Sequence, residues 1–277
     1  MIASRTPDRT MSLADAAGLV ADGARIGFGG SWGLARRPMA FVRELIRQGR
    51  SGLHVHGILS GIDADMLIGA GAAASTVTSY VGLDELGQAP NFQRAAASGA
   101  IEVREYSEWL ITAGFRATNM ALPYLPWITS RRNDLARELG LQEVRCPYTG
   151  TPLLAVRAIE LDVAVIQAVR CDSAGNAALS VPLDFMYDVD ALLARSAKTV
   201  IVCAEEIGAV DPNMVQLIAR EVDAVVHAPG GAWPGSMNTC YPVDRAHIRD
   251  TYLPAARAEG GFSVYLDEHV QQGERSR

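Results

Sequence analysis

A glycine-rich stretch followed by two arginines has the residue types that bind anions. Gly29, Gly30 and Ser31 follow a short apolar run, and Arg36 and Arg37 precede a predicted helix. Glycine leaves backbone N–H groups open to a ligand, a helix start favours negative charge, and guanidinium groups pair with carboxylates and phosphates. We therefore predict that this loop binds an anion or an oxyanion.

Two simpler interpretations of the same stretch stay open. The glycines can form a tight turn that lets the helix pack on the sheet, and the arginines can be solvated at the helix start. A dinucleotide-binding loop does not fit, because the G-x-G-x-x-G pattern counted from Gly27 places Trp32 where the third glycine belongs. No acidic residue ends the next apolar run, at 53–59.

Carboxylates follow two of the predicted strands, and parallel sheets bind ligands at such strand ends. Glu105 and Glu108 follow one strand, and Glu205 and Glu206 end another. A carboxylate can attack a thioester carbonyl as a nucleophile or accept a proton as a base. The alternative for Glu108 is structural, because Ser107 can cap a helix whose dipole favours an acid in the first turn.

Other catalytic and binding chemistries lack support in the sequence. The net charge of −6 and the pI near 5.4 argue against a nucleic-acid surface. No nucleophile elbow, P-loop or H-E-x-x-H motif occurs, and the five histidines lack the spacing of metal ligands, so we expect no metal. His54 and His56 alternate along one apolar run, as residues of a strand do.

Targeting and redox signals favour a cytoplasmic protein. The four cysteines are widely spaced with no C-x-x-C pair, which is typical of reduced thiols. The first ten residues are polar and lack the apolar core of a signal peptide. No apolar run approaches the length of a membrane span. We expect a cytoplasmic location and no membrane contact.

Apolar runs and amphipathic segments alternate along the chain, which is typical of an α/β protein with an open, mostly parallel sheet covered by helices on both faces. Residues 123–150 are predicted to be a long excursion, because prolines break a helical run and a polar loop follows. We expect one domain over residues 1–277. The predicted strands are 24–28, 53–59, 76–81, 101–104, 161–169, 198–204 and 223–227, and the main helices are 38–48, 63–68, 91–98, 108–122 and 189–196.

The order of segments resembles the alpha subunit of the family I coenzyme A transferases, in the glutaconate CoA-transferase branch. Each matching stretch is short, but together they keep the family's order from residue 26 to residue 241. The most telling are Ile-Gly-Phe-Gly-Gly at 26–30, Arg-Arg-Pro-Met-Ala at 36–40, Glu-Tyr-Ser at 105–107, Gly-Asn at 175–176, Glu-Glu-Ile at 205–207 and Gly-Ala-Trp-Pro at 231–234.

This resemblance implies the family's open-sheet fold, with a coenzyme A thioester and a carboxylic acid as substrates and no bound cofactor. It also implies a beta subunit of similar fold, with the active site between the two chains. The nucleophilic glutamate of such enzymes lies in a Ser-Glu-Asn-Gly or similar motif of the beta subunit. This chain lacks that motif, so we expect it to be inactive alone.

The resemblance also implies roles for the residues of the glycine-rich stretch. The loop at Gly29 and Gly30 would form the oxyanion or acyl pocket, with Ser31 beside it as a further contact to substrate. Arg36 or Arg37 would bind an anionic group of the substrate or of CoA.

Other candidates lie later in the chain. Asn176 is a candidate for binding substrate or CoA, whereas Glu205 and Glu206 match the alpha-subunit pattern and are expected to form structural hydrogen bonds. Four aromatic residues could line a large acyl pocket, although such residues lie more often in a core: Trp32, Tyr80, Trp109 and Trp127.

A second activity also fits the resemblance. Residues 36–43 and 98–105 are similar to the alpha subunits of steroid-ring-opening hydrolases, which share this fold and cleave a carbon–carbon bond of a cyclic acyl-CoA with water. There Glu105 or Glu108 would act as the general base, in the cleft between the subunits. A non-catalytic acyl-CoA-binding module is a third interpretation. We favour transfer of CoA.

Overall fold

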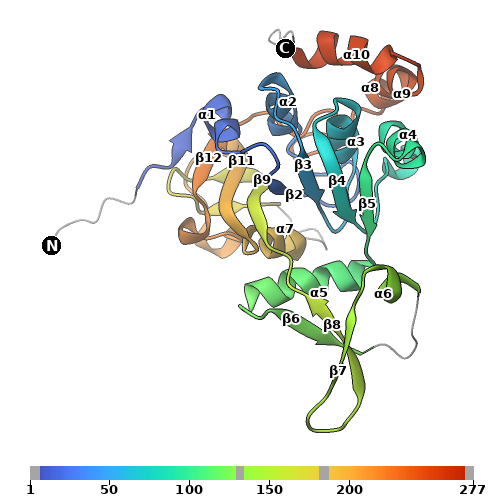
Figure 1. Ribbon diagram of the computed structural model, residues 1–277. Helices are drawn as coiled ribbons and strands as arrows, with labels where there is room; N and C mark the ends of the chain where they lie inside the picture. Colours follow the sequence, from blue (N-terminus) through green and yellow to red (C-terminus); the bar gives the residue numbers. More distant parts are fainter. Residues whose placement is uncertain (1–6, 129–133, 181–186, 272–277) are drawn as a thin grey trace, which may run out of the picture.

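A mostly parallel β-sheet lies at the centre of the computed structural model, which describes residues 7–128, 134–180 and 187–271 (Figure 1). The strands follow the order β1-β12-β11-β9-β2-β3-β4-β5, and every pairing along this path is parallel. Among the described strands of this sheet, β10 (Ala177–Ala178) alone runs antiparallel, beside β9. The path strands are β1 (Thr10–Met11), β2 (Arg25–Phe28), β3 (Leu53–His56), β4 (Ala73–Thr78), β5 (Glu102–Glu105), β9 (Leu161–Cys171), β11 (Ala197–Ile207) and β12 (Ala224–His227).

Helices cover both faces of this sheet, which confirms the predicted fold class. None of the described helices is long and apolar enough to cross a bilayer. The α-helices outside the small sheet are α1 (Leu13–Gly18), α2 (Met39–Arg47), α3 (Ile62–Gly69), α4 (Pro90–Ser98), α5 (Glu108–Asn119), α7 (Tyr187–Ala194), α8 (Arg245–His247), α9 (Leu253–Arg257) and α10 (Gly261–Leu266), and short 3-10 or π turns are η1 (Asp84–Leu86), η2 (Pro212–Met214), η3 (Ala219–Glu221), η4 (Ile248–Tyr252) and η5 (Asp267–Gln271).

The two faces of β9 separate two hydrophobic cores. Val163 and Val165 face the core that α1, α2, α3 and the C-terminal helices cover, whereas Ala164 and Ile166 face the core under α5 and α7. This alternation is the two-residue period of a strand with both faces buried. The apolar run that predicted strand β9 therefore contributes side chains to both hydrophobic cores.

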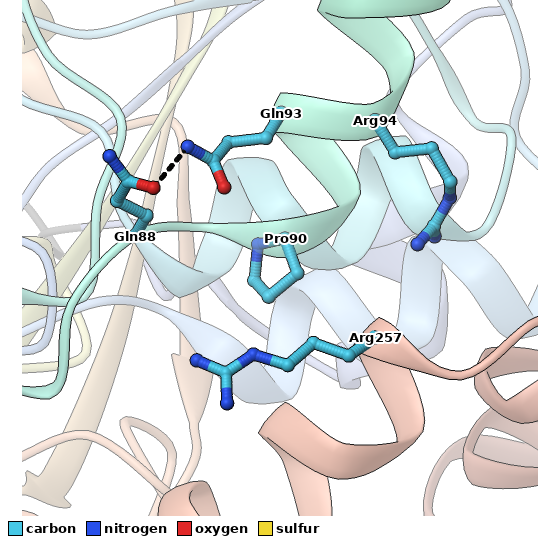
Figure 2. A pocket seen from close by; sticks show the side chains of 5 residues that line it. All are labelled: Gln88, Pro90, Gln93, Arg94 and Arg257. Carbon is cyan, nitrogen blue, oxygen red and sulfur yellow. Dashed lines mark hydrogen bonds between the residues drawn. The ribbon is translucent and has the colours of Figure 1, made fainter.

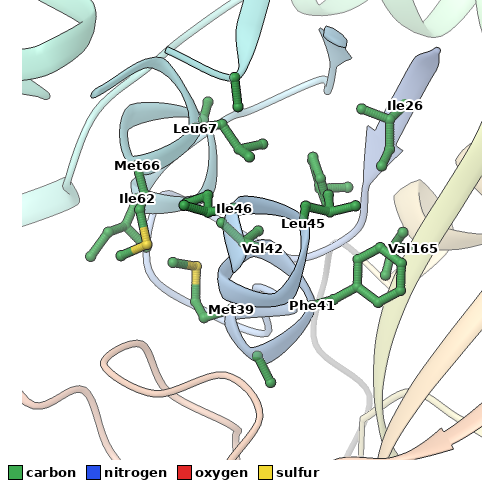
Figure 3. Close-up of a cluster of buried hydrophobic side chains, with 14 of the residues drawn as sticks. Ile26, Met39, Phe41, Val42, Leu45, Ile46, Ile62, Met66, Leu67 and Val165 are labelled. Carbon is green, nitrogen blue, oxygen red and sulfur yellow. The ribbon is translucent and has the colours of Figure 1, made fainter. Parts of the chain in front are cut away.

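Helix α2 is the main link between the glycine-rich loop and the first core. Phe41, Val42 and Leu45 lie against Ile26 and Val165 of the sheet, and Met39 and Ile46 face α3 (Figure 3). Pro38 takes the N-cap position, so the helix begins at Met39, one residue after the predicted start. The loop that precedes α2 is thus held at its far end by a buried helix.

The chain builds the sheet outwards from the neighbouring strands β2 and β9, in opposite directions. It adds β3, β4 and β5 on one side of β2, and then returns to place β9, β11 and β12 on the other side. All these strands are parallel, so their carboxyl ends lie at one edge. The loops that follow β2 and β9 leave this edge in opposite directions, which is the position where open α/β sheets bind ligands.

The segment after α5 folds as a second, antiparallel sheet, whereas the sequence had predicted a loop-like excursion. Its order is β6-β8-β7, and it packs on α5 through Leu110, Ala113 and Val156. These strands are short and half-exposed, so they lack the apolar runs that identified the main sheet. The elements are β6 (Tyr124–Trp127), α6 (Asp134–Glu138), β7 (Gln142–Arg145) and β8 (Pro152–Arg157), and the predicted polar loop at 129–133 lies outside the described residues.

Histidine 56, at the carboxyl end of β3, makes stability depend on pH. The structure confirms that His54 and His56 are strand residues. Burial lowers the pKa of His56 from 6.5 to about 4. Between these values the unfolded chain takes up a proton that the folded chain does not, so stability is lost as pH falls from 6.5 towards 4.

We expect His56→Gln to lose part of the pH dependence of stability. In the unsubstituted protein this histidine should lower the free energy of unfolding by about 2 kcal/mol between about pH 7.5 and about pH 5. Urea unfolding at both pH values measures the difference, and His227→Gln, at an exposed histidine, is the control. An unchanged pH dependence in His56→Gln would contradict the assignment.

Candidate functional site

The glycine-rich loop lies at the carboxyl edge of the sheet, and its first amides are bonded within the protein. Gly29 N–H donates to the Val165 carbonyl (2.9 Å) and so extends the pairing of β2 with β9. Gly30 N–H donates to Oδ1 of Asp190 on α7 (2.6 Å), and Ser31 N–H donates to the Ala35 carbonyl (3.0 Å). The backbone does meet an anion here, but that anion is a side chain of this chain.

A second carboxylate binds the middle of the loop. Asp84 accepts from the N–H groups of Gly33 (2.8 Å) and Leu34 (3.0 Å) through its two oxygens. Burial raises the pKa of Asp84, and these two amide donors act against that rise. The amides of Gly29, Gly30 and Ser31 thus donate within the chain, and the binding of a substrate oxyanion by this loop stays a prediction.

The two arginines also face inward, and their predicted binding of a substrate anion stays a prediction. Arg36 and Arg37 have no exposed surface. Arg36 forms an ion pair with Asp190, and Arg37 pairs with Asp63 (3.4 Å). Guanidinium groups carry several donors in a fixed fork, and burial requires partners for them.

Arg37 also satisfies the carbonyls that the loop turns inward. It donates to the carbonyls of Trp32 and of Leu59, the latter at 2.6 Å. Trp32 and Arg36 have φ angles of 56° and 54°, which are rare for residues with a side chain. The arginine bonds thus hold the loop in a strained conformation, and such strain is commonest at functional sites.

Close backbone contact joins this loop to the loop after β4. A Cβ on Gly33 would lie 2.1 Å from the Gly82 carbonyl oxygen, so the close approach requires glycine. The aromatic residues of the two loops remain accessible: Trp32 is 50% exposed and Tyr80 is 42% exposed. These two aromatics are therefore surface residues of the carboxyl edge rather than core residues.

Glutamate 205 accepts a hydrogen bond from a second glycine-rich segment, which follows β12 and contains Gly230. It accepts hydrogen bonds from Gln167 Nε2 (2.9 Å), Gly230 N–H (2.6 Å) and the Tyr241 hydroxyl (2.5 Å). Burial and the adjacent Glu205 raise the pKa of Tyr241. Glu206 forms an ion pair with Arg170 at the surface. The expected structural role of both glutamates is confirmed.

Asparagine 176 forms a turn and has its side-chain groups bonded to protein, and its predicted contact with substrate or CoA stays a prediction. Its Nδ2 donates to Asp172 (2.7 Å), and its Oδ1 accepts from Ala219 N–H (2.9 Å). Gly175, with a φ of 107°, permits the turn. The side chain therefore links the end of β9 to η3.

The glutamates after β5 differ from the buried carboxylates because both side chains are exposed. Ser107 caps α5 by accepting from Leu110 N–H (3.3 Å), which confirms the structural alternative for this segment. Trp109 is 67% exposed, and its ring lies 6.1 Å from that of Trp127. Glu105 and Glu108 are thus the accessible acids at this end of β5.

No other centre of chemistry is found among the described residues. No group of three or more histidine, cysteine, aspartate or glutamate side chains is arranged to hold a metal ion. All four cysteines are free thiols, and burial raises the pKa values of Cys171 and Cys203 to about 12, which disfavours the reactive thiolate.

A polar cavity of about 490 Å³ lies between the start of α4 and the end of α9 (Figure 2). The sequence analysis did not predict this cavity, because its residues come from two segments far apart in the chain and form no motif. Its lining residues are Gln88, Pro90, Gln93, Arg94 and Arg257.

We expect Asp190→Asn to destabilise the protein by about 3 kcal/mol or more, because it removes a carboxylate from a buried guanidinium and from the Gly30 amide. Urea unfolding measures the change. Asp188→Asn is the matched control, since Asp188 lies on the same helix and is exposed. Equal stability of the two variants would show that the buried pair contributes little.

Comparison with known proteins identifies the family. The model of the family described as Coenzyme A transferase matches residues 10–228. An uncharacterized protein of Archaeoglobus fulgidus is 34% identical over 95% of this chain, and this chain spans only 59% of that relative's length. A cholesterol ring-cleaving hydrolase IpdA subunit of Mycobacterium tuberculosis is 31% identical over 95% of this chain and 94% of its own.

A solved structure agrees with these sequence matches. The crystal structure of glutaconate coenzyme A-transferase from Acidaminococcus fermentans aligns with a TM-score of 0.88 and 28% identity, over 96% of this chain and 90% of that chain. The alpha subunit of that organism's enzyme is 29% identical over 95% of this chain and 88% of its own. The chain therefore belongs to the coenzyme A transferase family, and it resembles the alpha subunits of that family.

Proposed function

We propose that this chain is the alpha subunit of a heteromeric CoA-transferase, which moves CoA between an acyl-CoA and a carboxylic acid. A separate beta subunit would supply the nucleophilic glutamate. The observation that carries the proposal is that the inward-facing carboxylates at the carboxyl edge are already bonded within the chain. Asp190 and Asp63 pair with buried arginines, Asp84 binds two amides, and Glu205 accepts three hydrogen bonds.

A carboxylate in such a bonded state is a poor nucleophile, because attack would break its hydrogen bonds and leave buried donors unpaired. The transfer needs a carboxylate that attacks the thioester carbonyl and expels the CoA thiolate, which leaves an acyl anhydride. The thiolate then attacks the enzyme's own acyl carbon, which gives a glutamyl-CoA thioester and releases the acid. A glutamate from a partner chain fits these steps.

In this proposal the glycine-rich loop forms a rigid wall of the site. The internal carboxylates and Arg37 fix its backbone, and the loop presents Trp32 at the surface next to the loop that carries Tyr80. A wall of this kind positions the acyl group and excludes water from the reacting atoms.

Cleavage of a cyclic acyl-CoA by water is the second candidate. The specific observation in its favour is the exposure of Glu105 and Glu108 at the carboxyl end of β5, where an acid can reach a substrate between two subunits. The M. tuberculosis relative, named as part of a ring-cleaving hydrolase, aligns over nearly its whole length. In that reaction one of these glutamates acts as the general base.

Borohydride trapping tests the proposed transfer. The chain is co-expressed with a beta-like subunit, the complex is treated with borohydride in the presence of acyl-CoA, and both chains are examined by mass spectrometry. A glutamyl-CoA thioester is reducible, so we expect one glutamate of the beta subunit to be converted to an alcohol. Consumption of acyl-CoA without modification of either chain would exclude the transferase.

Substitution of Glu105 separates the two candidates by kinetics. Under the proposed transfer, the Glu105→Gln complex keeps most of its activity, as does Glu102→Gln at an exposed residue of the same strand. A general base contributes about 10²-fold to 10⁴-fold to a rate. A loss of that size in Glu105→Gln or Glu108→Gln, with normal activity in Glu102→Gln, would establish the hydrolase instead.

A further inference from the structure

The cavity between α4 and α9 is a candidate ligand site separate from the glycine-rich loop. Its volume of about 490 Å³ lies within the range of small-molecule sites, about 300–1,000 Å³. Figure 2 shows Arg94 descending from α4 and Arg257 extending from α9 below it, on either side of Pro90. Its lining therefore combines two guanidinium groups with the amides of Gln88 and Gln93.

The positive charge of this cavity is not neutralised by the chain itself. Arg94 donates to the Ala256 carbonyl (2.7 Å) and to Asn91 Oδ1 (2.6 Å), which are both uncharged acceptors. Among the described residues, no carboxylate forms an ion pair with Arg94 or Arg257. The two hydrogen bonds fix the Arg94 guanidinium in place, so two cations line one concave surface and favour an anion there.

The start of α4 is not the source of this attraction. The Phe92 N–H donates to Oδ1 of Asp65 (2.8 Å), and Asp65 has no exposed surface. A buried carboxylate of α3 therefore already occupies this helix end. What remains for a ligand is the charge and the donors of the side chains, above all the bidentate fork of Arg257 and the N–H groups that Arg94 does not use within the chain.

Short backbone contacts connect the cavity to the glycine-rich loop. Gln88 of the cavity pairs with Gly82 in an isolated antiparallel bridge, and the Gly82 carbonyl lies against Gly33 of the loop. Both features thus belong to one side of the carboxyl edge. An extended ligand with its anionic end in the cavity would therefore run along this edge towards the loop.

We propose that this cavity binds the phosphate-bearing nucleotide end of the CoA thioester, with Arg94 and Arg257 pairing with its phosphate oxygens. The inference rests on the proposed function, because it takes acyl-CoA as the substrate. CoA carries its phosphates at one end and its thiol at the other, joined by a flexible arm, so its phosphate end can occupy the cavity while the arm runs along the carboxyl edge. The carboxylic acid carries no phosphate, so this cavity is not assigned to it.

Calorimetry on the co-expressed complex tests the assignment, with CoA, ADP and inorganic phosphate as separate titrants. We expect Arg257→Gln to weaken CoA binding by about tenfold, through loss of a charge-assisted hydrogen-bond pair. Arg94→Gln should have a similar effect. Arg249→Gln is the control, because Arg249 is exposed and already paired with Asp250. In turnover assays KM for acyl-CoA should rise about tenfold while kcat is unchanged.

The titrants distinguish the possible sources of the anion. ADP should show the same loss in Arg257→Gln as CoA does, whereas inorganic phosphate should bind much more weakly. If Arg257→Gln and Arg94→Gln bind CoA as tightly as Arg249→Gln, the cavity is not the phosphate site. If these complexes still form the borohydride-trapped adduct, the proposed function stands although this inference fails. A variant that loses affinity only for the carboxylic acid overturns the inference in favour of an acid site.

Arg257→Gln is the decisive variant, because Arg257 makes no hydrogen bond within the described part of the chain and its loss leaves the packing of α9 unchanged. Arg94 joins α4 to α9, so its variant needs a thermal unfolding control. If the unsubstituted complex neither binds CoA nor forms the adduct, the proposed function fails, and this inference fails with it.

Discussion

The buried carboxylate of Asp190 is the interaction on which the arrangement of the carboxyl edge depends. It accepts from the Gly30 amide and pairs with Arg36, and it reaches them from a helix that follows β9. The chain builds the sheet in opposite directions from β2 and β9, so the loops at this position would otherwise separate. One fully buried ion pair therefore holds the loop after β2 against the helix that follows β9, where the two segments would otherwise separate.

The same solution recurs along this edge. Asp84 binds the next two amides of the loop, Asp63 pairs with Arg37, and Asp65 occupies the start of α4. Backbone amides without internal acceptors would be costly to bury, and aspartates supply these acceptors at short range. The result is a rigid edge at which these aspartates already form structural hydrogen bonds and ion pairs. For this reason we propose that the partner subunit supplies the reactive carboxylate.

The sequence was sufficient for the longer strands of the main sheet, because buried parallel strands are apolar runs such as β9 and β11, whereas the two-residue strands β1 and β10 were missed. It also indicated the chemistry of the glycine-rich loop, since an anion does meet the amide of Gly30. The sequence could not show that this anion is Asp190, because Asp190 lies 160 residues away from Gly30 and no local pattern identifies it as a partner. The small sheet and the cavity at Arg257 were missed for the same reason, since tertiary contacts create them.

Helix α5 belongs to two hydrophobic cores. Ile111 and Phe115 pack under the main sheet, whereas Leu110 and Ala113 pack on the small sheet. The small sheet packs on the rest of the chain mainly along this one helix. Most residues of the small sheet therefore have no neighbour in the main core. The changes in the free energy of unfolding caused by substitutions in the two parts should then be additive. Evolution can therefore remodel the small sheet, and the exposed acids at the start of α5, without disturbing the edge that Asp190 closes.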